Sequence, residues 1–208
     1  ELYGATETAI VTNLRPEFQK EKERCVGPPW FFNQVELLNE KGEEVDVGEQ
    51  GELFAKSPFL MNGYWEDEEN TNKNTNERGF FGVGDVAVKD EDGFYYIVDR
   101  KKDMIISGAT NISPREIEEI LLEIDGIIDV AVVGKKSKEW GEAVTAVMVK
   151  NKENIDLKQL EKYCRENLSS YKIPKEFHFV ESLPRNASGK ILKRVIKEEV
   201  DNNQLKVL

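Results

Sequence analysis

The chain has 208 residues, a formal net charge of −11 and a hydrophobic content of 39%. This length allows one or two domains, and the apolar content is enough for a packed core. The acidity argues against nucleic-acid binding, which needs a basic face, so we predict no nucleic-acid partner. Cys25 and Cys164 are far apart and have neither metal-ligand nor disulfide spacing, so we expect a reducing, cytoplasmic environment. No apolar run approaches the roughly 18 residues that a membrane-spanning helix requires.

The first half of the chain, residues 1–98, is predicted to be rich in β-strands. The strands are expected at residues 34–38, 51–55, 86–89 and 94–98. The last two flank Asp90-Glu91-Asp92-Gly93, a hairpin turn in which the glycine supplies the positive φ. Residues 66–78 are polar and rich in asparagine, which indicates a solvated loop or a short helix.

The second half, residues 103–208, has the pattern of a small α+β domain. Ser113 and Glu116, with Pro114 between them, predict a capping box at the start of a helix. That helix has one apolar face, formed by residues 117, 120, 121 and 124. A second helix is predicted after Asp156, and a third in the charged C-terminal tail. The strands are expected at residues 105–106, 127–133, 143–149 and 177–180.

Three separated motifs carry chemical information. The first, YGATE at residues 3–7, combines an aromatic ring, small residues, a hydroxyl and a carboxylate. The second is GD at residues 84–85, expected on a tight turn, followed by DRKKD at residues 99–103, a charged stretch without a core pattern. The third, PRNASGKILKR at residues 184–194, places Lys190 in a basic loop on an acidic chain. A mobile ammonium group of this kind can follow a developing negative charge.

In this order the motifs resemble those of the acyl-activating (adenylate-forming) enzymes, which join a carboxylic acid to AMP and then pass it to a thiol. The resemblance covers essentially the whole chain. It implies an α+β fold in which residues 1–101 are the β-rich C-terminal part of the large adenylation (AMP-binding) domain and residues 102–208 are the small, mobile C-terminal domain. It also implies ATP/AMP, Mg²⁺ and coenzyme A as ligands, with a carboxylic acid as the substrate.

The resemblance assigns roles to the first motif. Tyr3 stacks on the adenine, and Gly4 allows the ligand to approach the backbone closely. Thr6 contacts phosphate, and Glu7 helps to hold Mg²⁺, a hard cation that prefers oxygen ligands. Considered alone, the motif would be an ordinary strand-to-helix turn.

The second and third motifs receive roles in the same way. Asp85 accepts hydrogen bonds from both ribose hydroxyls, and Arg100 also reaches the ribose. Lys102 occupies the hinge position, and Lys190 bridges the acid carboxylate and the phosphate during adenylation. Val83 replaces the threonine that is usual in the family, which removes one hydroxyl. Without the resemblance, these residues would be surface salt bridges and solvated charges.

A further group is implied to bind coenzyme A. Gly108 lies in the loop that lines the tunnel for the pantetheine arm, where Ala109 replaces a second glycine found in many relatives. Four residues are implied to hold the nucleotide end by stacking and phosphate pairing: Trp140, Tyr171, Lys172 and Lys175. Their alternative role is ordinary packing.

The motifs and the resemblance together predict an acid–thiol ligase, namely an AMP-forming acyl-CoA ligase of fatty or aryl acids. Two alternatives stay open: an adenylation domain that loads a carrier protein, and a non-catalytic nucleotide-binding or interaction module. The family's Gly/Ser/Thr-rich phosphate loop is absent from the 208 residues. We therefore expect the chain to be a C-terminal piece of a longer enzyme that is inactive alone. The sequence identifies neither the acid nor the oligomeric state.

Overall fold

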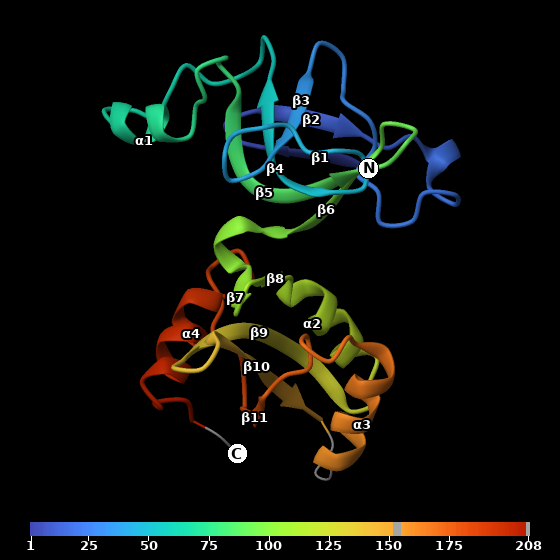
Figure 1. The fold of residues 1–208 in the computed structure, drawn as a ribbon, viewed down its shortest axis with the longest axis vertical. Helices are drawn as coiled ribbons and strands as arrows, with labels where there is room; N and C mark the ends of the chain where they lie inside the picture. Colours follow the sequence, from blue (N-terminus) through green and yellow to red (C-terminus); the bar gives the residue numbers. More distant parts are fainter. Residues whose placement is uncertain (152–154, 207–208) are drawn as a thin grey trace. The chain divides into compact units, whose positions relative to one another are not determined.

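The structure is a computed structural model that describes residues 1–151 and 155–206. It divides into two compact units, Glu1–Lys102 and Asp103–Leu208, each with its own β-sheet (Figure 1). Helices cover the sheet of the second unit, so the predicted α+β class is confirmed. In the described part of the chain, every helix is too short or too polar to cross a membrane.

The first unit is built from two antiparallel sheets. The smaller sheet pairs β1 (Leu2–Ala5) with β2 (Ala9–Asn13), a hairpin that the sequence did not predict. The larger has the order β3-β4-β5-β6, with bounds Gln34–Leu38, Gln50–Lys56, Phe81–Lys89 and Tyr95–Arg100. A 3-10 turn, η1 (Pro16–Phe18), follows β2, and the short helix α1 (Glu68–Lys73) lies between β4 and β5. Val11, Leu53 and Ala87 are fully buried in the core of this unit.

The placement of Gly84 and Asp85 corrects one expectation. The predicted tight turn is instead the interior of β5, which begins five residues earlier than expected. Glu52 pairs with Val86 and Phe54 with Gly82, so the β5 residues between these pairs bulge outward opposite a single residue of β4. Gly84 has φ +75°, a conformation that glycine adopts without strain and that permits the bulge.

The second unit is a five-stranded sheet covered by helices. After the 3-10 turn η2 (Lys101–Asp103), the strands β7 (Ile105–Ser107) and β8 (Thr110–Ile112) form a hairpin. Two long strands, β9 (Ile127–Ser137) and β10 (Gly141–Lys150), pair antiparallel, and β11 (Glu176–Phe179) pairs parallel with β10. The helices are α2 (Pro114–Leu122), α3 (Leu157–Asn167) and α4 (Lys193–Asp201).

Side chains along β9 and β10 alternate between the two faces of the sheet, and both faces are buried in the middle of each strand. Val130 and Val132 pack with α2 and α3, whereas Ala131 and Val133 pack with α4. The helices lie on both faces of this strand pair in Figure 1. A strand that is buried on both faces has no polar side, so its sequence is a continuous apolar run.

The helix starts agree only partly with the predicted caps. Asp156 caps α3 and accepts a hydrogen bond from the Lys158 amide at 2.9 Å. Ser113 is the N-cap residue of α2, but its side chain makes no cap hydrogen bond. Glu116 does not complete the predicted capping box, because its carboxylate accepts hydrogen bonds from Lys172 Nζ at 2.6 and 2.7 Å.

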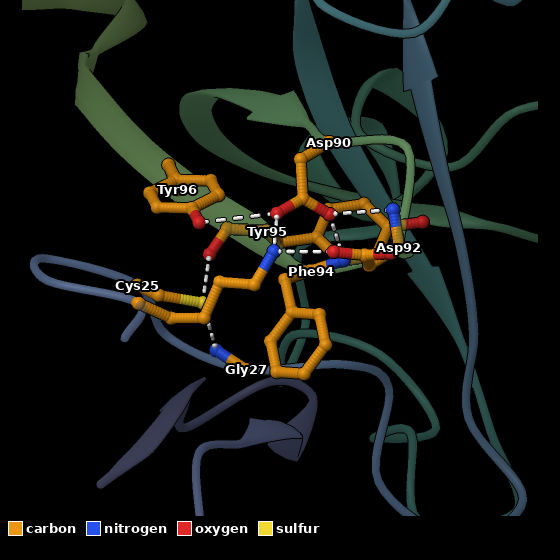
Figure 2. Close-up of polar contacts among 8 residues, drawn as sticks. Cys25, Gly27, Asp90, Asp92, Phe94, Tyr95 and Tyr96 are labelled. Carbon is orange, nitrogen blue, oxygen red and sulfur yellow. Dashed lines mark hydrogen bonds and ion pairs between the residues drawn. The ribbon is translucent and has the colours of Figure 1, made fainter. Parts of the chain in front are cut away.

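A polar cluster fastens the loop after β2 to the β5–β6 hairpin (Figure 2). The Asp90 carboxylate accepts hydrogen bonds from Lys22 Nζ (2.7 Å), from Tyr96 Oη (3.1 Å) and from the Phe94 amide (2.9 Å). Burial opposes the ionisation of Asp90, but these donors outweigh it and hold the pKa of its carboxyl below the ordinary value. Cys25 lies next to this cluster, and its thiol bonds to the Tyr95 carbonyl.

We expect this cluster to make stability depend on pH. A lowered folded-state pKa stabilises the protein above the unfolded-state pKa of about 3.9, and the contribution is lost as the pH falls through the folded-state value. Asp90→Asn should therefore lower the free energy of unfolding at neutral pH by roughly 1–3 kcal/mol, and the difference from the unsubstituted chain should shrink below about pH 4. Urea unfolding at several pH values measures both.

Asp92→Asn is the matched control. Asp92 also contacts Lys22 Nζ, at 2.6 Å, but its side chain is 70% exposed, so its loss should cost well under about 1 kcal/mol. Equal losses from the two substitutions would contradict the central role of Asp90.

Candidate active site

Asp85 and Asp99 are buried acidic residues of the first unit, and Asp85 lies within the second sequence motif. Asp85 is 5% exposed. The β5 bulge directs its side chain toward β1 and β6, and one group from each of these strands contacts the carboxylate. Tyr3 Oη donates to Oδ2 at 2.5 Å, and Arg100 Nε lies 2.9 Å from Oδ1. Arg100 also donates to the Val83 carbonyl at 3.0 Å. The second sequence motif and the start of the first therefore meet at one carboxylate.

Tyr3 is a hydrogen-bond donor rather than an acid in this arrangement. Burial raises the pKa of its phenol, and the hydrogen bond to Asp85 raises it further. The neighbouring residue, Gly4, is required by the backbone packing of the hairpin. A Cβ at this position would lie 1.9 Å from the Ala9 carbonyl oxygen, so only glycine fits where the β1–β2 register shifts.

Thr6 and Glu7 lie in the turn that joins β1 and β2. Thr6 is exposed and Glu7 is half-buried. The Glu7 carbonyl accepts a hydrogen bond from the Met61 amide at 2.8 Å, and its Oε1 accepts one from Tyr64 Oη at 2.9 Å. Sequence reasoning missed Tyr64, because more than fifty residues separate it from Glu7 and no local pattern joins the two.

The oxygen donors of this turn fit part of a Mg²⁺ site. Within the described residues, Oε2 of Glu7 accepts no hydrogen bond and is available to a cation. The described residues contain no group of three or more His, Cys, Asp or Glu side chains arranged to hold a metal. Glu7 therefore suits a Mg²⁺ ion that takes its other ligands from phosphates and water, which is how Mg²⁺ usually binds.

Lys190 is the unpaired cation of its loop. Four other basic side chains of residues 185–197 pair with carboxylates: Arg185 with Asp129, Lys193 with Glu118, Arg194 with Glu198 and Lys197 with Glu142. Lys190 is exposed, and its ammonium group contacts no carboxylate among the residues that the structure describes. Its charge is therefore available to a ligand.

The backbone that carries Lys190 is closed by hydrogen bonds. Asn186 Oδ1 accepts from the Lys190 amide at 2.9 Å, and the Lys190 carbonyl accepts from the Asn186 amide at 2.9 Å. Arg185 donates to the Gly189 carbonyl and to Asp129 Oδ2, both at 2.6 Å. The stretch that carries Lys190 is thus a hydrogen-bonded turn on which the lysine is exposed.

Gly108 and Trp140 lie together in the second unit. Gly108 has φ +62° in the β7–β8 turn, and its amide donates to the Trp140 carbonyl at 2.7 Å. Next to this bond, Ser107 pairs with Gly141. Trp140 is 46% exposed, so its ring is accessible rather than part of the core. Two of the residues implied to bind coenzyme A therefore share one surface.

The remaining predicted residues have varied surroundings. Lys172 is held by Glu116 and lies 5.7 Å from the ring centre of Tyr171, which is exposed. The structure thus gives Lys172 an internal partner, whereas Lys175 is exposed and its ammonium group has none among the described residues. Lys102 is exposed and is the last residue of the first unit.

Arg185→Ala should loosen the turn that carries Lys190. Removing charge-assisted hydrogen bonds worth about 1–3 kcal/mol should speed hydrogen exchange of the Gly189 and Lys190 amides by roughly tenfold or more. Global stability should change little, because the pair lies at the surface. Arg194→Ala, which removes an exposed pair within α4, is the control and should leave both amides unchanged. Unchanged exchange in Arg185→Ala would contradict the role given to this guanidinium.

Comparisons with known proteins show what the chain is similar to. Residues 1–65 match the AMP-binding enzyme family and residues 116–190 match the AMP-binding enzyme C-terminal domain. The 2-succinylbenzoate–CoA ligase of Bacillus licheniformis is 41% identical over 92% of this chain and 40% of its own length. The long-chain-fatty-acid–CoA ligase of Salmonella typhimurium is 39% identical over 96% of this chain and 36% of its own length.

Solved structures give the same result. The o-succinylbenzoate CoA synthetase of Bacillus subtilis in complex with the acyl-adenylate intermediate has a TM-score of 0.88 and 36% identity, covering 94% of this chain and 40% of that one. The same enzyme with ATP and a magnesium ion has a TM-score of 0.86 and 34% identity, covering 96% of this chain and 40% of that one. Both matched models are those of AMP-binding enzymes, so the chain is similar to the C-terminal part of these enzymes, and it spans about 40% of the length of the relatives it matches.

Proposed function

We propose that the complete gene product containing this chain is an acid–thiol ligase that activates a carboxylic acid with ATP and transfers the acyl group to coenzyme A. The observation that carries the proposal is the unpaired Lys190 on a hydrogen-bonded turn of an acidic chain. An exposed charge without a partner is ready to bind an anionic group, and the reaction involves several. The two ligases named above use different carboxylic acids, so we propose the substrate class and leave the acid open.

The first half-reaction forms acyl-AMP. A carboxylate oxygen of the acid attacks the α-phosphorus of ATP, and the bond to the β-phosphate oxygen breaks to release pyrophosphate. Lys190 neutralises the charge that develops between carboxylate and phosphate. Asp85 accepts hydrogen bonds from the ribose hydroxyls while Arg100 holds its carboxylate in place, and Tyr3 stacks on adenine. Thr6 contacts phosphate, and Mg²⁺ at Glu7 would supply charge neutralisation for the phosphates.

The second half-reaction forms the thioester. The thiol sulfur attacks the acyl carbon, the mixed anhydride bond breaks, and AMP leaves with the electron pair. The turn at Gly108 lines the path of the pantetheine arm. Trp140 and Tyr171 are exposed and available to stack on the coenzyme's adenine, and Lys175 is available to its phosphates. Lys172 would have to leave Glu116 to take part.

The two alternatives have separate tests. Transfer to a carrier protein, in place of coenzyme A, would appear as acylation of that protein. A non-catalytic module would bind a nucleotide, and so be protected against heating, without releasing pyrophosphate in the presence of any acid. Residues 1–208 alone are expected to release none, because most of the phosphate-binding donors are missing.

Lys190→Ala in the complete gene product should separate the half-reactions. Loss of one preorganised charge should slow pyrophosphate release by a factor on the order of 10²–10³, or roughly 3–4 kcal/mol. Thioester formation from preformed acyl-AMP should stay near its normal rate, as measured by consumption of the free thiol. Folding should be unaffected, because Lys190 is exposed. An equally deep loss of the thioester step in a folded variant would show the assigned role to be wrong.

Lys102→Pro tests the proposed hinge between residues 1–101 and 102–208. Proline fixes φ near about −65°, so it should trap one arrangement of the two domains and depress one half-reaction far more than the other. Lys102→Ala is the control and should leave both half-reactions near normal. Proline at Lys101 would be a poorer control, because that substitution also removes the ion pair between Lys101 and Glu52. Equal losses in both half-reactions of Lys102→Pro would argue against a hinge.

A further inference from the structure

The segment between β4 and β5 makes two hydrogen bonds to Glu7. The Met61 amide donates to its backbone carbonyl at 2.8 Å, and Tyr64 Oη donates to its carboxylate oxygen Oε1 at 2.9 Å. The two bonds come from residues three positions apart in the same loop. Together they fix both the backbone of the β1–β2 turn and the direction of the Glu7 side chain.

Tyr64 is itself held in place from two sides. Its amide donates to Thr71 Oγ1 at 2.9 Å, and its ring meets the buried ring of Phe81 edge to face, with 6.2 Å between the ring centres. Thr71 belongs to α1 and Phe81 is the first residue of β5. The preceding Gly63 has φ +145°, and a Cβ there would lie 3.2 Å from Thr71, so the loop packs closely. Tyr64 therefore reaches Glu7 from a well-defined position.

The hydrogen bond between Tyr64 and Glu7 leaves one carboxylate oxygen of Glu7 for a ligand. The Tyr64 phenol donates its hydrogen bond to Oε1 of Glu7 at 2.9 Å. A phenol has one O–H, and it occupies Oε1. Within the described residues Oε2 accepts no hydrogen bond, so it is the oxygen that a cation can bind.

We propose that Tyr64 is a positioning residue that orients Glu7 toward the divalent cation of a bound nucleotide. This inference rests on the function proposed above and adds a residue to it. Groups that orient a metal ligand in this way are typically worth about 10–100-fold in metal affinity or activity. The bond itself is partly exposed, since Tyr64 is 36% exposed, and should add little to stability because water can replace it.

The test is Tyr64→Phe in the complete gene product, which keeps the ring against Phe81 and removes only the hydroxyl. With ATP present and no carboxylic acid, Mn²⁺ serves as the probe, and its binding is followed by electron paramagnetic resonance. The substitution should weaken Mn²⁺ binding by roughly tenfold or more. With Mg²⁺ in the activity assay, the Mg²⁺ concentration for half-maximal pyrophosphate release should rise by a similar factor, with less change in kcat at saturating Mg²⁺.

The second unit offers a matched control. Tyr163 Oη donates to Glu123 Oε2 at 2.7 Å, so Tyr163→Phe removes the same type of phenol–carboxylate bond at a different glutamate. It should leave Mn²⁺ binding unchanged. In a Glu7→Gln background, Tyr64→Phe should have little further effect, because a residue that acts through Glu7 has nothing left to orient.

The outcomes separate the two proposals. If the unsubstituted protein binds Mn²⁺ with ATP and Tyr64→Phe binds it equally well, the positioning role is wrong and the proposed function stands. A drop in Tyr64→Phe that persists in the Glu7→Gln background would also overturn it, because Tyr64 would then act by another route. If the unsubstituted protein neither binds Mn²⁺ with ATP nor releases pyrophosphate with any acid, both proposals fail.

Discussion

A buried carboxylate needs partners, and this need at Asp85 shapes the first unit. A carboxylate whose side chain is 7% exposed is costly to bury unless opposite charge and hydrogen-bond donors surround it. The partners come from two different strands: Tyr3 from β1 and Arg100 from β6. The bulge at Gly84, the tight β1–β2 contact at Gly4 and the pairing of β5 with β6 all place these groups around one carboxylate.

In the second unit, the charged groups of interest are basic side chains paired with carboxylates, rather than a buried carboxylate. Its basic side chains between residues 185 and 197 are paired with carboxylates, apart from Lys190. Pairing has two effects here: Arg185 holds the turn, and the neutralised neighbours leave Lys190 as the local positive charge. On a chain of net charge −11, a polyanionic ligand meets long-range repulsion. A single projecting ammonium group can offset this repulsion only at short range, where its effect depends on geometry.

The parts of the fold that were predictable from sequence are those whose signal is local. The apolar periodicity of α2, the apolar runs of β9 and β10 and the turn at Gly93 depend on neighbouring residues, and each lies where it was expected. The hairpin of β1 and β2 was missed because its polar turn and short strands have no clear period. The capping box at Ser113 failed because a distant group, Lys172, competes for Glu116, and no local rule includes that competition.

The residues of the candidate site also divide into those with a local sequence signal and those that depend on distant contacts. Motif order was enough to select Asp85, Arg100 and Lys190, since each lies in a recognisable stretch of sequence. Tyr64 could not be selected in this way, because its hydroxyl meets Glu7 only after β4, α1 and β5 have brought two distant segments together. The residues proposed to touch a ligand lie in sequence motifs, whereas Tyr64, proposed to orient Glu7, is defined by tertiary packing. A supporting residue is therefore best sought by following the hydrogen bonds outward from each motif residue, and Tyr64 is what that search finds next to Glu7.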